Sequence, residues 1–278
     1  MSKTEARIHR DCPKLAVKRQ LFKTQCNRSH VKRVSFDRVA DEYDETRYLP
    51  QDAMNKVLDA LCEEMSGGES VLDVGFGTGR FAVPLLMRGF SVTGIDISKK
   101  MIAISNAKGF SRCVMGDASF LPFRSHSFDF ALANHVLHLL EDWMDALSEI
   151  RRVVRTSLIS VIIVKESGWF KEGYDDFLER YGYERKTLGI GEKELSERMP
   201  PRAVRATASV TLTQSADIVL DRLERRCLST QWEVPEDIHR KAIAEMKKKY
   251  GGKELESSYD VVTCVWDVDD FDVSALMY

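Results

Sequence analysis

The sequence lacks the features of membrane, secreted and disulfide-rich proteins. No apolar run approaches the roughly 20 residues needed to cross a bilayer. The first ten residues, MSKTEARIHR, contain no apolar core of the kind found in a secretory signal. The six cysteines are scattered singly, without a Cys-x-x-Cys pair, which favours reduced thiols over a disulfide framework or a zinc site. We therefore expect a cytoplasmic protein.

A surplus of one sign of charge is also absent, since 41 Lys and Arg nearly balance 43 Asp and Glu. The charge is nevertheless uneven along the chain. Residues 1–34 hold ten basic and two acidic side chains, a net +8 that leaves −10 on the rest. We expect these residues to form a flexible basic arm beside a folded domain of residues 35–278. A basic arm can bind nucleic acid, but an acidic body argues against a broad nucleic-acid surface, and nucleic acid is not the expected partner.

The stretch Ser70–Arg80, SVLDVGFGTGR, joins a short apolar strand to a helix through three glycines. Glycine has no Cβ, so a ligand can approach the backbone N–H groups of such a turn closely, and the start of the next helix favours negative charge. A dinucleotide-binding turn is spaced G-x-G-x-x-G. Arg80 stands where its third glycine would be. The turn alone leaves a nicotinamide dehydrogenase open, and Arg80 counts against it.

Strand and helix patterns alternate on both sides of this turn. Helical spacing is found at 36–47, 54–65, 81–87, 97–108, 147–154, 216–226 and 235–249. Strand patterns are found at 71–74, 90–95, 112–115, 128–134, 158–164, 204–212 and 258–268. This order predicts an α/β fold with a doubly wound, mostly parallel sheet.

Polar side chains follow the predicted strands where parallel strands end together. Asp96 ends the second strand, 23 residues after Asp73, near the spacing at which an acid binds ribose hydroxyls in such folds. The alternative is that Asp96 caps the next helix, a role that Ser98 can fill instead. Asp117 follows the third strand, and Asn134 ends the fourth.

In this order, the motifs resemble the class I S-adenosylmethionine-dependent methyltransferases, and most closely the methyltransferase type 11 group acting on small molecules. The pattern D-x-G-x-G-x-G from Asp73 is similar to motif I of that class. The resemblance covers residues 36–164 and implies a Rossmann-like sheet of seven strands, the last one antiparallel. The chain departs from the family at residues 155–157, Arg-Thr-Ser, where a proline and glycines usually make a turn.

The resemblance also implies a cofactor, S-adenosyl-L-methionine, at the strand ends. Asp96 would bind its ribose, Asp117 would face the adenine amino group, and Asn134 would meet the methionine moiety. The expected cofactor-binding residues are Asp73, Gly75, Phe76, Gly77, Gly79, Arg80, Asp96, Ile97, Asp117, Ala118 and Asn134.

The candidates for a catalytic base are His135, His138 and Tyr43, in that order. The two histidines stand three residues apart and are also typical of capping or packing positions. No third ligand with a matching motif accompanies them, so no metal site is predicted. Tyr43 belongs to the pattern F-D-x-x-A-x-x-Y-D-x-x-R from Phe36. The pattern resembles an N-terminal helix of small-molecule methyltransferases whose tyrosine helps close over the cofactor. A helix that only packs on the domain would show the same spacing of apolar residues.

Residues 166–203 are rich in aromatic side chains amid charges. We expect them to form a helical cap, inserted between the fifth and sixth strands, that covers the acceptor through Trp169, Phe170 and Tyr174. The alternative is a rigid helix pair packed on the sheet edge.

The predicted function is methyl transfer to a small molecule. The signature of many amine methyltransferases, Asn/Asp-Pro-Pro-aromatic, is absent, and Asn134-His-Val-Leu stands in its place. Two other classes stay open. One is an RNA methyltransferase that uses the basic arm, and the other is a protein that binds the cofactor without turnover.

Overall fold

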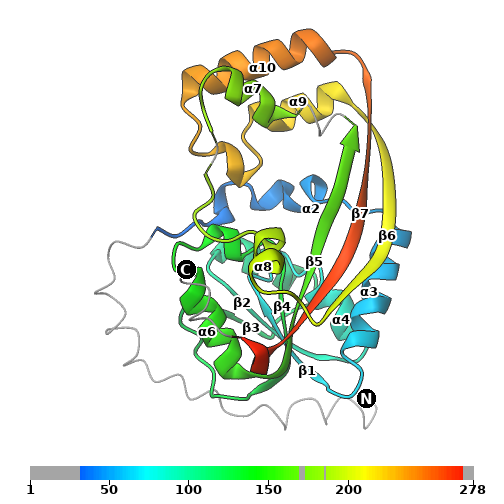
Figure 1. The fold of residues 1–278 in the computed structure, drawn as a ribbon, viewed down its shortest axis with the longest axis vertical. Helices are drawn as coiled ribbons and strands as arrows, with labels where there is room; N and C mark the ends of the chain where they lie inside the picture. The colour runs from blue at the N-terminus through cyan, green and yellow to red at the C-terminus, as the bar shows by residue number, and fades with distance from the viewer. Residues whose placement is uncertain (1–31, 169–172, 185, 272–278) are drawn as a thin grey trace. The chain divides into compact units, whose positions relative to one another are not determined.

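The computed structural model describes residues 32–168, 173–184 and 186–271 of the chain. Within these residues seven strands form one sheet in the order β3-β2-β1-β4-β5-β7-β6 (Figure 1). Strands β1 to β5 pair in parallel, whereas β7 runs antiparallel to both of its neighbours, β5 and β6. The predicted doubly wound fold, with an antiparallel last strand, is therefore confirmed.

The strands are β1 (Ser70–Val74), β2 (Ser91–Asp96), β3 (Cys113–Met115), β4 (Phe128–Ala133), β5 (Val154–Gly168), β6 (Ala203–Ser215) and β7 (Glu254–Asp267). The α-helices are α2 (Tyr43–Thr46), α3 (Gln51–Glu64), α4 (Ala82–Met87), α5 (Lys99–Ala107), α6 (Trp143–Val153), α7 (Tyr174–Arg180), α8 (Glu192–Arg198), α9 (Ala216–Glu224) and α10 (Glu236–Tyr250). Short 3-10 turns η2 (Phe36–Arg38), η3 (Ala40–Glu42) and η4 (Leu137–Leu139) lie near the site described below.

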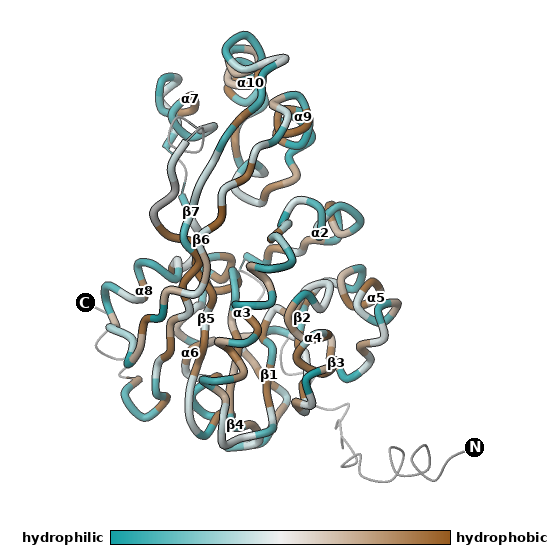
Figure 2. The backbone as a smooth tube through the Cα atoms, turned by 90° about the vertical axis from the view of Figure 1, so that its right-hand side faces the viewer, coloured by the Kyte–Doolittle hydropathy of each residue, from teal (hydrophilic) through white to brown (hydrophobic). Residues whose placement is uncertain are grey.

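Each face of the sheet is covered by its own layer of buried apolar side chains. Alternation along β1 shows this directly, because Leu72 belongs to the cluster under α6 whereas Val71 belongs to the cluster under α3 and α4. Figure 2 shows hydrophobic residues gathered along the central strands and hydrophilic residues on the outer turns. This two-layer packing fixes the strand ends on which the site is built.

The strand β5 begins earlier than predicted because Val154 already pairs with Phe128 of β4, and Arg155 and Thr156 lie in a register shift before the ladder resumes at Ser157. The guanidinium of Arg155 lies 2.8 Å from a carboxylate oxygen of Asp129, and the hydroxyl of Thr156 donates to the Asp129 carbonyl. The departure from the family pattern at residues 155–157 is thus not a turn. Helix α6 passes directly into the strand at Val154.

The predicted helix at residues 36–47 is wrong in form, since the chain makes two 3-10 turns before the short α2. The carboxylate of Asp37 accepts hydrogen bonds from the Ser98 hydroxyl (2.6 Å) and the Lys100 N–H (3.0 Å) at the start of α5. These two hydrogen bonds hold residues 36–47 against the start of α5. A tertiary contact therefore overrides the helical spacing here.

Helices α7, α9 and α10 form a third apolar cluster, named here the helical cap, which lies beyond the long strands β5, β6 and β7 (Figure 1). The predicted cap at 166–203 is therefore divided. Its first helix, α7, packs with α9 and α10, whereas its second helix, α8, contacts β5. Trp169 and Phe170, expected to face the acceptor, lie outside the described residues.

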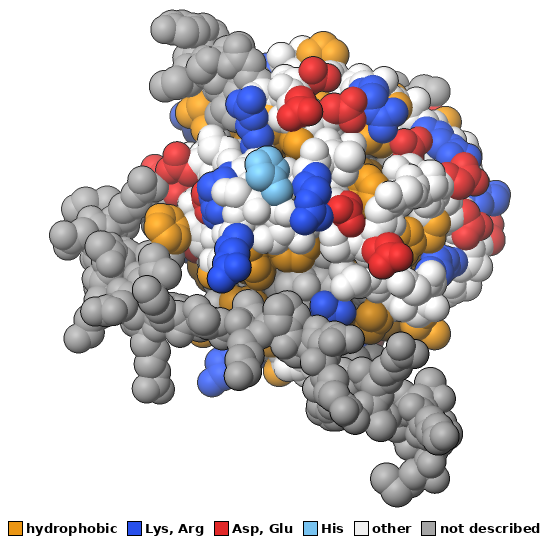
Figure 3. Space-filling model, turned by 90° about the horizontal axis from the view of Figure 1, so that it is seen from below, with side chains coloured by type: hydrophobic (Ala, Val, Ile, Leu, Met, Phe, Trp, Pro, Cys, Tyr) orange, Lys and Arg blue, Asp and Glu red, His pale blue; other side chains and the backbone are white. Residues whose placement is uncertain are grey.

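Charged side chains of both signs share the face seen in Figure 3, which views the molecule from below Figure 1. Lys and Arg are interspersed with Asp and Glu there, among single hydrophobic side chains. The described residues therefore do not gather a single-sign patch on this face.

Tyr174 belongs to the core of the helical cap, not to an acceptor surface. It is 7% exposed, and its hydroxyl lies 2.5 Å from Nδ1 of His239. The other ring nitrogen of His239 lies 3.2 Å from the Glu224 carbonyl. Tyr174 thus links α7 to α10 and, through His239, to the end of α9.

Replacing Tyr174 by alanine should therefore destabilise the protein. We expect the free energy of unfolding to fall by about 3–5 kcal/mol, as for other buried aromatic side chains. Denaturant unfolding measures this change. The control is Tyr48→Ala, at a side chain that is 64% exposed, where a change within about 0.5 kcal/mol is expected. Equal stability of the two variants would contradict the burial of Tyr174.

Candidate active site

The glycine turn after β1 brings backbone N–H groups to the carboxyl end of the sheet. Gly75 has φ +67°, and a Cβ at this position would stand 2.7 Å from a methyl carbon of Val136. Gly77 has φ +56°, and a Cβ there would come no closer than 3.8 Å to the Tyr43 ring. Gly75 therefore packs against the chain beyond β4, whereas Gly77 leaves space above it.

Asp96, at the end of β2, holds this turn in place. One carboxylate oxygen accepts from the Gly77 N–H and the other from the Ser98 N–H, both at 2.8 Å. Ser98 caps α5, since its hydroxyl accepts from the Met101 N–H at 3.2 Å, so the cap role does not fall to Asp96. Each oxygen of Asp96 keeps a lone pair for a ligand hydroxyl. Burial raises the pKa of Asp96, with the backbone hydrogen bonds opposing that shift.

An open pocket of about 670 Å³ lies at these strand ends. The structure brings many of the predicted site residues together in its wall. Those that line it are Tyr43, Gly75, Gly77, Asp96, Ile97, Asp117, Ala118, Asn134 and His135.

The other predicted residues, Asp73, Phe76, Gly79, Arg80 and His138, are not part of this wall. Phe76 is buried and packs on Phe110 with ring centroids 5.4 Å apart. Asp73 is buried within β1, where desolvation raises the pKa of its carboxyl group to about 8, with the nearby Asp96 adding to the shift. Both residues are therefore buried in the interior and do not line the pocket.

Arg33 enters the same pocket and was missed by the sequence analysis. Its Nε lies 2.6 Å from a carboxylate oxygen of Asp117, and its Nη2 lies 2.7 Å from Asp142. Its backbone forms an antiparallel bridge with Leu140. Arg33 and Val34 line the pocket, so the boundary predicted between residues 34 and 35 falls inside the site.

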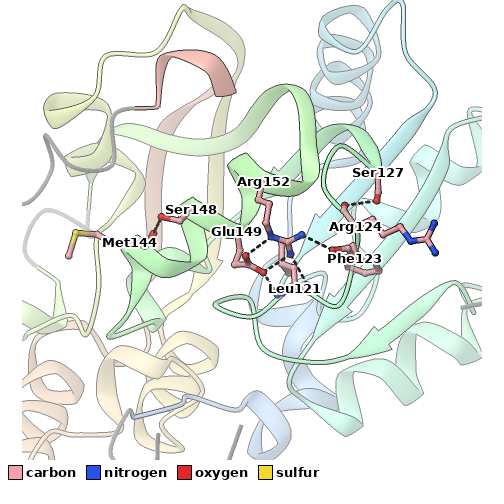
Figure 4. Close-up of polar contacts among 8 residues, drawn as sticks. All are labelled: Leu121, Phe123, Arg124, Ser127, Met144, Ser148, Glu149 and Arg152. Carbon is pink, nitrogen blue, oxygen red and sulfur yellow. Dashed lines mark hydrogen bonds and ion pairs between the residues drawn. The ribbon is translucent and has the colours of Figure 1, made fainter. Parts of the chain in front are cut away.

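The loop that carries Asp117 and Ala118 is anchored from α6 (Figure 4). The guanidinium of Arg152 donates to the carbonyls of Phe123 (2.7 Å) and Leu121 (2.9 Å) and pairs with Glu149. Glu149 in turn accepts from the Leu121 N–H at 2.8 Å. The position of the loop is therefore set by a helix that follows it in sequence.

Asn134 lies in the pocket wall and carries an unpaired hydrogen-bond donor. Its side-chain oxygen accepts from the Val161 N–H at 2.7 Å, which fixes the orientation of the amide. Its Nδ2 is buried and has no hydrogen-bond partner among the described residues. Because buried donors are normally paired, this atom indicates a ligand with an acceptor group beside Asn134.

His135 is held in a left-handed backbone conformation, φ +56°, that few residues other than glycine adopt. Its N–H donates to a carboxylate oxygen of Glu192 at 2.6 Å, and Glu192 is a buried residue at the start of α8. Close docking of Gly189 beside the same loop supports this contact, because a Cβ there would stand 2.2 Å from the carbonyl oxygens of Leu137 and Leu140.

The two aromatic candidates that line the pocket, His135 and Tyr43, are both uncharged at neutral pH. Desolvation of the imidazole, with added repulsion from Arg47 and Arg80, lowers the pKa of His135 to about 4, although the residue as a whole is exposed. Burial raises the pKa of Tyr43 above its usual value. His138, the third candidate, is 6.4 Å from His135 between ring centroids and outside the pocket wall.

Within the described residues there is no cluster of three or more His, Cys, Asp or Glu side chains placed to hold a metal ion. In the same part of the chain, no helix is both long and apolar enough to cross a membrane.

The pocket fits the cofactor that the sequence resemblance implies. The free lone pairs of Asp96 suit two neighbouring hydroxyls of a ribose, and the unpaired Nδ2 of Asn134 suits a carboxylate. Open space above Gly77 admits a ligand close to the backbone. The expected contact of Asp117 with the adenine amino group would have to share a carboxylate that is already in use. Asp117 accepts hydrogen bonds from Arg33 and from the Ser119 N–H.

Comparison with known proteins finds methyltransferases. A type 11 family model, described as a methyltransferase domain, matches residues 72–159. The chain is 29% identical over 206 residues to the O-methyltransferase resE of Aspergillus sclerotiorum, covering 70% of this chain and 76% of that protein. It is 32% identical over 141 residues to a demethylmenaquinone methyltransferase of Staphylococcus aureus, covering 47% of this chain and 58% of the relative.

Solved structures share the fold. The YcgJ protein from Bacillus subtilis superposes with a TM-score of 0.50 at 18% identity, covering 76% of this chain and 98% of that one. The aligned part spans less than two thirds of the demethylmenaquinone methyltransferase. The matched family model covers the chain from β1 to the first part of β5 and does not extend to β6 or β7.

Replacing Asp96 by asparagine should weaken cofactor binding. Asparagine keeps the size of the side chain but turns an N–H₂ donor toward either the Gly77 or the Ser98 N–H, and it loses the charge-assisted bonds to a ligand. Such bonds contribute about 1.5–3 kcal/mol each, so affinity for S-adenosylhomocysteine should fall at least about tenfold by calorimetry. Unchanged affinity in a folded variant would show that Asp96 does not contact the ligand.

Shortening the N-terminus tests where the functional domain begins. A chain that begins at Ser35 loses Arg33 and Val34 from the pocket, whereas a chain that begins at Lys32 keeps them. We expect the first to bind S-adenosylhomocysteine about tenfold more weakly than the second, because loss of ordered, partly buried charge pairs costs on the order of 1–2 kcal/mol. Calorimetry on both chains measures the difference. Equal affinities would restore the boundary at residue 35.

Proposed function

We propose that this chain, which belongs to the class I S-adenosylmethionine-dependent methyltransferases, methylates a small molecule. The observation that carries the proposal is the pocket at the ends of β1, β2 and β4, with Asp96 and Asn134 in its wall. When bound, S-adenosylmethionine supplies an electrophilic methyl group whose leaving group is a neutral thioether. Catalysis can then rest mainly on alignment and exclusion of water.

Some residues of the pocket bind the cofactor, and others orient the acceptor. Asp96 binds the ribose hydroxyls, Asn134 donates to the methionine carboxylate, and the turn at Gly77 lets the cofactor lie close to the backbone. His135 and Tyr43 contact the acceptor at the same end of the pocket as Asn134. Phe36 supports Tyr43, with ring centroids 5.7 Å apart.

His135 accepts a hydrogen bond from the acceptor more readily than it removes a proton. An imidazole with a pKa of about 4 is unprotonated at neutral pH, so its lone pair is available. The same pKa makes it a weak base, since efficient proton transfer needs a pKa near the working pH. Tyr43 stays protonated, because burial raises the pKa of its phenol, and it donates a hydrogen bond. Both side chains therefore orient the acceptor.

The enclosing elements favour a small acceptor. Arg33 and Leu140 bridge one side of the pocket, and Phe36 and Tyr43 stand in its wall. The relatives named above include an enzyme described as an O-methyltransferase, which supports a hydroxyl or carboxylate oxygen as the accepting atom.

Incubation of the full chain with a small-molecule extract and methyl-labelled S-adenosylmethionine tests the proposal. We expect mass spectrometry to find label in a small molecule, and clearly less label with the Asp96→Asn variant when the cofactor is limiting. Label found only in RNA would support an RNA methyltransferase instead. Binding of the cofactor with no labelled product from varied extracts would support a protein without turnover.

A further inference from the structure

The loop between α9 and α10, residues 225–235 and named here the cap loop, reaches from the helical cap to a residue of the pocket wall. Its Trp232 lies beside Phe36, with ring centroids 5.0 Å apart. Phe36 lines the pocket and also contacts Tyr43, at 5.7 Å between ring centroids. Tyr43, Phe36 and Trp232 therefore form a row of three aromatic rings that joins the pocket wall to the helical cap.

Hydrogen bonds within the cap loop fix the orientation of Trp232. Its indole N–H donates to the Arg226 carbonyl at 2.8 Å. The guanidinium of Arg226 in turn donates to the Val234 carbonyl at 2.9 Å. Gln231 is fully buried, and its side-chain oxygen accepts from the Leu228 N–H at 3.1 Å. The loop is thus tied to itself on both sides of the indole, which is held in one direction by the protein alone.

Charged side chains join the cap loop to the segment of residues 32–43. Arg225 pairs with Glu42 at 2.5 Å, and Glu233 pairs with Lys32 at 2.9 Å. All four side chains are largely exposed, so each pair adds little stability by itself. Because the two loop residues flank the indole in sequence, the pairs restrict how the segment lies on the cap loop.

The sheet side of the molecule holds the backbone of the same segment. The carboxylate of Asp37 accepts hydrogen bonds from the start of α5, and that of Asp44 accepts from the Thr78 hydroxyl at 2.6 Å. These two acids directly follow Phe36 and Tyr43 in the sequence. The anchors therefore fix the backbone beside each ring, whereas the direction of the rings depends on what packs against them.

Trp232 supplies a surface for the Phe36 ring. The planes of these two rings meet at 55°, and those of Phe36 and Tyr43 meet at 88°. Tilted and edge-to-face contacts are the arrangements that aromatic pairs prefer, so both contacts are directional. Because Phe36 takes part in both, a change in the direction of its ring is passed on to Tyr43.

We propose that Trp232 is a positioning residue for the methyl acceptor, because through Phe36 it holds the Tyr43 ring in the direction that orients the acceptor. The inference rests on the proposed function, in which Tyr43 donates a hydrogen bond to the acceptor. Trp232 itself is not part of the pocket wall. The helical cap thereby contributes to methyl transfer without touching a ligand and without moving.

The effect of Trp232 falls on the acceptor and not on the cofactor. The cofactor-binding side chains Asp96 and Asn134 stand at the ends of β2 and β4, on elements other than the segment that Trp232 contacts. Loss of the indole therefore leaves these two side chains in place, whereas the Tyr43 ring loses its support.

The alternative is that Trp232 only stabilises the helical cap. In that case any change that loosens the cap should act on Tyr43 in the same way. Tyr174 offers this comparison, because its hydroxyl lies 2.5 Å from Nδ1 of His239 in the core of the cap. The variant Tyr174→Phe removes that hydrogen bond and leaves the row of three rings unchanged.

Fluorine NMR of the full chain, labelled with 3-fluorotyrosine, follows Tyr43 directly. Its signal is assigned by its loss in Tyr43→Phe. In Trp232→Leu we expect the signal to move toward the chemical shift of a solvent-exposed fluorotyrosine, because the ring is no longer held against Phe36. In Trp232→Phe, which keeps a ring beside Phe36, the signal should stay close to that of the unmodified chain.

Transfer of label from saturating methyl-labelled S-adenosylmethionine to a small-molecule extract gives a second measurement. Trp232→Leu should transfer at least about tenfold less label, since misplaced groups in a site lower the rate steeply, and Trp232→Phe should retain most of the transfer. Affinity for S-adenosylhomocysteine should stay within about threefold in both variants.

The matched control, Tyr174→Phe, should leave the Tyr43 signal and the transfer of label unchanged. If Trp232→Leu fails to fold, Phe36→Leu removes the same ring contact from its other side. That variant should displace the Tyr43 signal in the same direction.

An unchanged Tyr43 signal in folded Trp232→Leu would overturn the inference, and so would an equal shift in Tyr174→Phe. A tenfold loss of affinity for S-adenosylhomocysteine in Trp232→Leu would also contradict it, because that result assigns the aromatic row to the cofactor. Failure of the proposed function looks different. It appears as no labelled small molecule with the unmodified chain, whatever the Tyr43 signal does.

Discussion

The site depends on one carboxylate, that of Asp96, which joins two strands at their ends. By accepting from both Gly77 and Ser98, it links the turn after β1 to the start of α5. The positive φ of Gly77 requires this support, because a flexible glycine would otherwise sample many conformations. The same carboxylate faces the pocket. Structural and binding roles therefore fall on one side chain, and the turn is ordered before a ligand arrives.

Three anchors come from chain segments remote from the glycine turn. Arg33 reaches Asp117 from before the first helix, Arg152 fixes the loop around Leu121 from α6, and Glu192 holds the backbone of His135 from α8. Each is a charged group that satisfies backbone or carboxylate atoms at the pocket rim. In a preorganised fold such hydrogen bonds require little loss of conformational entropy, and they hold the wall of the pocket in place. The pocket is thus lined and held by segments that lie between Arg33 and Glu192.

Sequence patterns predicted the strand-end chemistry because parallel strands deliver their carboxyl ends to one edge. Asp96, Asp117 and Asn134 reach the pocket for that reason. Arg33 and Glu192 were missed because no local pattern marks a contact between residues 84 or 57 positions apart. Burial of Tyr174 was missed for a similar reason, since its partner His239 lies on a helix 65 positions later. Arg33 had only one signal, its place at the end of a basic run.

The strands β5, β6 and β7 continue from the sheet to the helical cap without interruption, apart from register shifts near Val164 and Ala206. A swing of the cap about a hinge would have to break ladder hydrogen bonds in three paired strands at once. Whole-cap opening is thus mechanically stiff, and bending is confined to the two bulges. Ligands can then exchange through the opening that the pocket already has, with no swing of the cap.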